Sequence, residues 1–63
     1  MVLLDLINII DKNTNVCLWN DNSEIIEEFH SVEEIPDEYI NIPVIEITAG
    51  YFKIDIICKG VIV

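Results

Sequence analysis

A chain of 63 residues has room for one domain and not for a second, so residues 1–63 are expected to form a single domain. Twelve acidic residues face three lysines and no arginine, and this net charge of −9 argues against binding to nucleic acid or to an anionic membrane surface. Hydrophobic residues make up 52% of the chain, more than a small core can bury, which predicts a homo-oligomer, in the simplest case a dimer.

Residues 2–10 are predicted to form a helix that is buried almost all round. Asp5 and Asn8 stand three positions apart, and Asp11 and Lys12 follow at the same helical spacing, whereas a half-buried strand alternates every second residue. Residues 11–15 are a cluster of turn-forming residues and are predicted to be a loop.

The next segments predict a β-hairpin. Residues 16–19 are short, β-prone and bounded by polar residues, and residues 20–23 have the composition of a tight turn, since Asn and Asp tolerate left-handed backbone angles. Residues 24–30 are open to two interpretations. Apolar residues from Ile25 to Val32 recur at helical spacing, but the turn before them implies a partner strand. We favour the strand.

A short helical turn is predicted between residues 32 and 40, because Ser31 and Glu34 have the form of a capping box and Pro36 suits a first helical turn. Four apolar residues then point inward: Val32, Ile35, Tyr39 and Ile40.

Two alternating strands are predicted at residues 44–49 and 51–59, joined by a tight turn at Ala49 and Gly50. In the first strand Ile45 and Ile47 share a face, and Val44 lies on the other with Glu46 and Thr48. In the second, Ile57 lies opposite the face that carries Phe52, Ile54, Ile56 and Cys58. The predicted fold class is α+β: an N-terminal helix packed on a small antiparallel sheet of three to four strands, with a short helical turn before the last two strands.

No motif predicts catalysis, a cofactor or a metal site. Residues 11–15 open like a calcium loop, but Val16 stands where the loop needs Gly and Asn22 where it needs Glu. His30 lies among glutamates, but a zinc site needs at least three well-placed ligands. One protomer of this size is too small to enclose a usual ligand pocket, so we do not expect an enzyme.

The compartment predicted from the sequence is the cytoplasm. Cys17 and Cys58 have neither CxxC nor zinc-type spacing and are expected to be reduced thiols whose pKa is raised by apolar surroundings. The start of the chain lacks a basic region, and Asp5 interrupts its apolar run, so no signal peptide is predicted. No apolar run reaches the 18 residues that a membrane span needs.

The segments follow one another from Leu-Leu-Asp-Leu-Ile through Asn-Thr-Asn-Val and Glu-Ile-Pro to the alternating strands at residues 44–49 and 52–57. In this order the chain resembles short acidic proteins encoded by phages and mobile elements of low-GC bacteria. Such proteins include inhibitors of host defence, among them anti-CRISPR proteins, which act by binding without catalysis. The resemblance implies an inhibitor in the host bacterial cytosol. It contains no specific motif, so no site residue is transferred.

The expected function is therefore that of a non-enzymatic module that binds a basic surface of a host protein. The partner-binding residues are expected to be seven acids with two aromatic residues: Glu24, Glu27, Glu28, Glu33, Glu34, Asp37, Glu38, Trp19 and Tyr39. The dimer interface is expected at four apolar residues: Ile57, Val61, Ile62 and Val63.

Three alternatives stay open. The seven acids would also keep an apolar chain soluble without binding anything. The chain would alternatively sequester a small ligand, a nucleotide or metabolite, at a dimer seam, or serve as a structural or assembly subunit.

Overall fold

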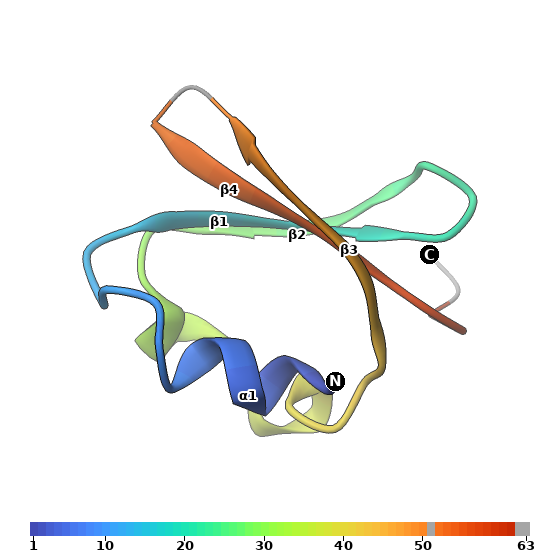
Figure 1. Ribbon diagram of the computed structural model, residues 1–63, viewed down its shortest axis with the longest axis horizontal. Helices are drawn as coiled ribbons and strands as arrows, with labels where there is room; N and C mark the ends of the chain where they lie inside the picture. The colour runs from blue at the N-terminus through green and yellow to red at the C-terminus, as the bar shows by residue number, and fades with distance from the viewer. Residues whose placement is uncertain (51, 62–63) are drawn as a thin grey trace.

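The computed structural model describes residues 1–50 and 52–61, which form two layers (Figure 1). One layer is a four-stranded sheet, and the other holds the short helix α1 with two 3-10 turns, η1 and η2. In chain order the elements are α1 (Leu3–Ile7), β1 (Asn15–Asn20), β2 (Ile25–Phe29), η1 (Val32–Glu34), η2 (Asp37–Tyr39), β3 (Val44–Gly50) and β4 (Lys53–Cys58).

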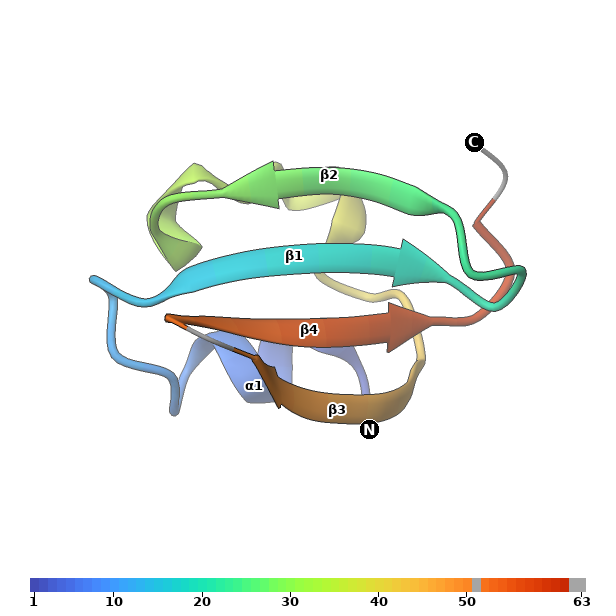
Figure 2. The ribbon, with the colours of Figure 1, turned by 90° about the horizontal axis from the view of Figure 1, so that it is seen from above.

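The strands lie in the order β2-β1-β4-β3, with the first and last strands of the chain side by side in the centre (Figure 2). β1 pairs with β4 in parallel, while β1 with β2 and β3 with β4 form antiparallel hairpins. The two central strands hold the most deeply buried side chains, whereas β2 and β3 are largely exposed. The two edge strands, β2 and β3, both carry glutamates.

The predicted fold class is wrong in two respects. The sheet is mixed and not antiparallel, because the two hairpins join through the parallel pair of β1 and β4. The N-terminal helix has five residues where residues 2–10 were expected, so the domain is dominated by its sheet. The predicted turn before the last two strands is present as η1 and η2.

The helix is short because its sequence supports only about one turn and a half. The Asp5 carboxylate accepts a hydrogen bond from the Val2 N–H at 3.0 Å and closes the first turn. At the other end the Ile9 N–H donates to the Leu6 carbonyl, three residues back, which tightens the chain and ends the helix. The isoleucines beyond Leu6 are weaker helix formers than leucine, so they do not prolong it.

The core lies between the sheet and the helical layer. It is formed by nine buried residues: Leu3, Leu6, Val16, Leu18, Phe29, Val32, Ile35, Ile56 and Cys58. Of the residues predicted to point inward around the helical turn, Val32 and Ile35 are buried, and Tyr39 and Ile40 are half-buried. The strand interpretation of residues 24–30 is confirmed by β2.

Two irregularities change the predicted strand faces. The pairing register of β3 shifts between Val44 and Glu46, so Ile45 is an extra residue and Val44, opposite Cys58, packs against the core. The prediction that Ile45 and Ile47 share one face and that Val44 lies on the other is therefore wrong. Phe52 was expected within the last strand, on the face that carries Ile54. It lies before the start of β4, with a φ of 62° and 85% of its surface exposed.

Candidate functional site

The seven predicted binding acids lie in one stretch of the chain, residues 24–38. We name them the acidic edge: Glu24, Glu27, Glu28, Glu33, Glu34, Asp37 and Glu38. They begin just before β2, which is an edge strand of the sheet, and continue through η1 and η2. All seven side chains are exposed. The acids thus follow the edge strand β2 and the two 3-10 turns after it, and the side chains of the consecutive residues Glu27 and Glu28 point to opposite faces of the sheet.

The acidic edge has no balancing charge of its own. Residues 24–38 include no lysine or arginine, and the lysines of the chain are Lys12, Lys53 and Lys59. Across residues 1–50 and 52–61, the ion pair that the structure contains is Lys53 with Asp55, outside the acidic edge. Among the described residues, no ion pair therefore neutralises these seven carboxylates, although Lys53 and Lys59 line surface hollows together with Glu28 and Glu38.

Two of the seven carboxylates also order the local backbone. Glu24 accepts a hydrogen bond from the Asn20 side-chain amide at 3.0 Å, which ties the start of β2 to the end of β1. Glu34 accepts one from the backbone N–H of His30 at 3.0 Å, and the Ser31 hydroxyl accepts from the N–H of Glu33 at 3.2 Å. These bonds fix the path of the chain from β2 into η1.

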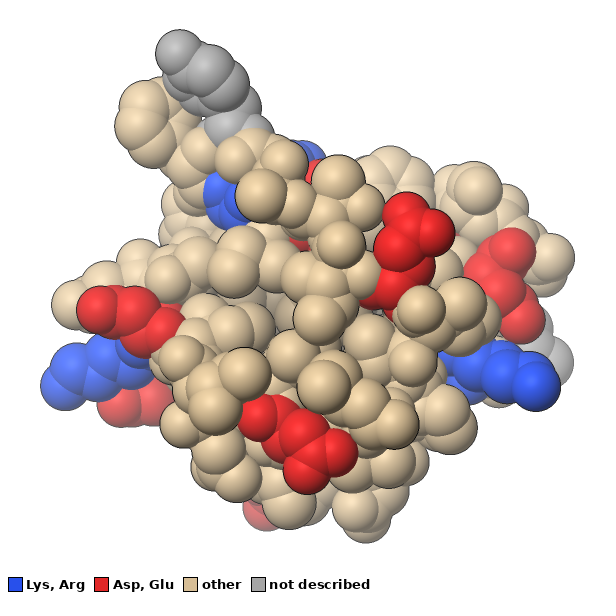
Figure 3. All heavy atoms as spheres, viewed as in Figure 1, with Lys and Arg blue, Asp and Glu red and all other residues tan. Residues whose placement is uncertain are grey.

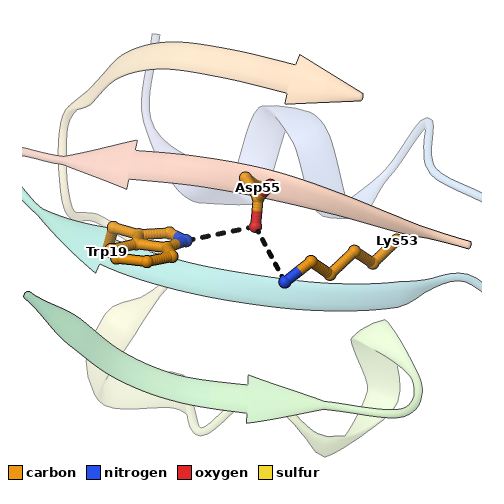
Figure 4. A network of polar contacts seen from close by, with 3 residues as sticks. All are labelled: Trp19, Lys53 and Asp55. Atoms are coloured by element: carbon orange, nitrogen blue, oxygen red, sulfur yellow. Dashed lines mark hydrogen bonds and ion pairs between the residues drawn. The ribbon is translucent and has the colours of Figure 1, made fainter. Parts of the chain in front are cut away.

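Trp19 lies on the outer face of the sheet, the face opposite α1. Its indole N–H donates to a carboxylate oxygen of Asp55 at 3.1 Å, and the Lys53 ammonium lies 3.6 Å from the same oxygen (Figure 4). Trp19 is half-buried and sits beside Ile57 on β4 and Ile25 on β2. These contacts hold the indole ring in a fixed position on the sheet.

The predicted partner-binding residues do not all come together. Tyr39 is the last residue of η2, directly after Glu38 at the end of the acidic edge, and is half-buried against the core. Trp19 belongs to the outer face, next to the acidic edge through its pairing with β2. The structure therefore places an aromatic side chain on each of two adjoining surfaces.

The predicted dimer residues are also separated. Ile57 lies on the outer face beside Trp19, as its predicted face required, and Val61 packs against the core. Ile62 and Val63 lie outside the described residues. The structure therefore does not assemble these four residues into one described patch.

Both cysteines are buried free thiols, on opposite faces of the sheet. Cys17 pairs with Asp55 on the outer face, and Cys58 belongs to the core. Burial raises the pKa of the Cys17 thiol, and the charge of Glu28 adds to the rise; burial alone raises the pKa of Cys58. A protonated, covered thiol is a poor nucleophile, so neither cysteine is poised for catalysis.

The described residues line two hollows large enough to consider as ligand sites. The first, beside Glu28, His30 and Lys53, has about 110 Å³, below the roughly 300–1,000 Å³ of usual ligand pockets. The second, beside Glu38, Tyr39 and Lys59, has about 510 Å³ but is wide open to solvent. With one lysine, it offers little to hold the phosphates of a nucleotide.

The chain matches no protein-family model, no curated protein and no solved structure. Among residues 1–50 and 52–61, no cluster of three or more His, Cys, Asp or Glu side chains is arranged to hold a metal ion. In the same part of the chain, no helix is long and apolar enough to cross a membrane.

One feature of the surface was missed at the sequence level. The Trp19–Asp55 hydrogen bond joins residues 36 positions apart, and it depends on the parallel pairing of β1 with β4. The alternation of residues 53–58 placed Asp55 on the face of Ile57, which was the one available signal. No local pattern indicated which strand would pair with residues 53–58.

Proposed function

We propose that this chain is a non-enzymatic interaction protein whose acidic edge binds a basic surface of another protein. The observation that carries the proposal is the exposure of seven carboxylates within residues 24–38, a stretch without a lysine or arginine. Such a field accelerates the encounter with an oppositely charged partner and fixes its orientation. Tyr39 at the end of this edge and Trp19 beside it supply aromatic side chains of the type enriched at binding hot spots.

The resemblance to short acidic phage proteins suggests the class of partner to test first. A bacterial defence protein with a lysine- or arginine-rich groove is positively charged and therefore complements the acidic edge. An inhibitor needs only to occupy that groove. The same proposal assigns the chain to the bacterial cytosol, and the two free thiols are compatible with a reducing compartment.

The proposal is tested by capturing proteins from a bacterial lysate on three immobilised versions of the chain. The first is native, the second is Glu27→Gln/Glu33→Gln/Glu38→Gln, and the third is Asp11→Asn/Asp21→Asn/Glu46→Gln. Both variants lose three charges from exposed positions, but only the second loses them from the acidic edge. The two variants therefore have the same net charge.

We expect a partner that binds the native chain and the third version and that is weakened on the second. Its capture should also fall between about 0.05 M and about 0.5 M salt, because the Debye length shortens from more than 10 Å to less than 5 Å. Equal capture by all three versions would show that the acids only keep the chain soluble.

A further inference from the structure

The sheet has two edge strands, β2 and β3. β2 belongs to the acidic edge, whereas the outer side of β3 has a different composition. The N-terminal segment covers only its start: the Val44 N–H donates to the Met1 carbonyl at 2.8 Å, and Val2 forms an isolated bridge with Pro43. Within residues 1–50 and 52–61, no strand pairs with β3 on this side beyond that bridge. Residues 46–50 pair regularly with β4 and present their other side to solvent.

The composition of β3 favours pairing with another strand. Its sequence, Val-Ile-Glu-Ile-Thr-Ala-Gly, has one charge and no proline or lysine, the residues that usually protect a sheet edge. Ile45 and Ile47 are 54% and 46% exposed. The face over β3 and α1 consists mostly of uncharged residues, with scattered acids on it and lysine atoms toward its margins (Figure 3). This edge thus combines free backbone groups with exposed apolar side chains.

We propose that β3 pairs in antiparallel orientation with β3 of a second copy, so that two sheets join into one of eight strands. The two-fold axis lies near Thr48, which places Ile47 opposite Ala49 and Glu46 opposite Gly50 of the second copy. An axis at Glu46 would instead bring two carboxylates together, which is unfavourable for directly opposed residues. A two-fold contact of this kind uses the same strand twice and closes after two copies.

Electrostatic repulsion does not prevent a second copy from pairing at this edge, although each copy carries −9. β3 is three strand positions from β2, so the two acidic edges would lie seven strand spacings apart, about 33 Å. This distance is several times the Debye length of about 8 Å at physiological salt, so repulsion between the acidic edges is screened. The inference goes beyond the proposed function, since the dimer leaves both acidic edges free for partners.

The first test is sedimentation equilibrium of the native chain with a matched pair of variants. Ile47→Lys adds a charge at the proposed contact, and Ile25→Lys adds the same charge to β2, where the isoleucine is also 46% exposed. We expect a dimer for the native chain and for Ile25→Lys, and at least a tenfold weaker dimer for Ile47→Lys with an unchanged circular dichroism spectrum. The proposal would be overturned if the native chain were a monomer at about 100 µM, a concentration at which even weak transient pairs associate. It would also be overturned if both variants dimerised with the same affinity.

The second test does not depend on how Ile47→Lys folds. A cysteine at Thr48 would face its copy across the axis, with Cβ atoms about 4.5–5.5 Å apart, close enough for a disulfide after a small adjustment. Mild oxidation of Thr48→Cys should give a covalent dimer, whereas Glu27→Cys on the acidic edge and the native chain, whose thiols are buried, should stay uncrosslinked. Equal crosslinking of Thr48→Cys and Glu27→Cys would refute the register.

Discussion

The side chain of Asn20 organises the turn between β1 and β2, and its replacement by alanine tests how that turn is held. Asn20 is 1% exposed, and its side-chain oxygen accepts hydrogen bonds from the N–H groups of Asn22 at 3.0 Å and Glu24 at 2.9 Å. Its amide group donates to the Glu24 carboxylate at 3.0 Å. Asn20→Ala therefore removes three hydrogen bonds from one buried position.

The expected loss of folding free energy follows from these three bonds. Each contributes about 1 kcal/mol, so Asn20→Ala should cost about 2–4 kcal/mol. A 63-residue domain has a total stability of roughly 3–9 kcal/mol, so this single change would remove a large part of it. Asn22→Ala is the matched control, because the Asn22 side chain is exposed and should change stability by less than about 0.5 kcal/mol.

Urea unfolding followed by the fluorescence of Trp19 measures both variants, since it is the one tryptophan of the chain and adjoins the turn. The midpoint should fall strongly for Asn20→Ala and barely for Asn22→Ala, with an unchanged slope. A loss below about 0.5 kcal/mol for Asn20→Ala would refute the role of the buried amide in the turn.

Three further predictions concern the turn, the outer face and the thiols. Ser23 has a φ of 63°, so Ser23→Gly should relieve strain and raise stability by up to about 1 kcal/mol in thermal unfolding, while an unchanged or lower midpoint would contradict it. Asp55→Ala should cost about 1–2 kcal/mol because the Trp19 indole loses its acceptor, whereas Asp55→Asn keeps an acceptor and should cost less; equal losses would exclude the indole bond as the cause. Burial raises the pKa of both Cys17 and Cys58 above the ordinary value of 9.0. The protonated thiols therefore stabilise the folded chain fully below about pH 9, and this stabilisation is lost as the pH rises through the raised pKa values. Fast reaction of both thiols with a thiol reagent in the native chain at neutral pH would contradict their burial.

Local patterns predicted the elements better than their arrangement. The first hairpin follows from tight-turn residues between β-prone segments, and β2 was assigned from the turn before it. The second hairpin was also expected, but its predicted turn at Ala49 and Gly50 is wrong, because both residues belong to β3 and pair with Ile54 and Lys53. The first turn itself works differently from the expectation: Ser23 has the left-handed backbone, while Asn20 contributes its side chain.

The mixed sheet was beyond a sequence-level argument because β1 and β4 pair across more than 30 residues. Their alternation is the same whether they pair with each other or with other strands, so periodicity cannot choose the neighbour or the direction. The extra residue at Ile45 likewise leaves no mark in the alternation of residues 44–49. The apolar residue types of β1 and β4 did contain the information that these strands are central.

The acidic residues of the candidate site were predictable, whereas the separation of the other residues was not. Exposure of seven carboxylates follows from the cost of burying a charge without a partner. The positions of Trp19, Tyr39 and Val61 depend on the packing of distant segments, which the local pattern does not contain.

The central claim, that the acidic edge is the binding surface, is tested most directly by mapping backbone amide signals of the labelled chain by nuclear magnetic resonance. The labelled chain is titrated with the protein that it captures from the lysate. We expect the signals of residues 24–38 to change, with smaller effects at Trp19 and none at residues 46–50 of β3. Changes centred on β3 and α1, with the signals of residues 24–38 unmoved, would contradict the account.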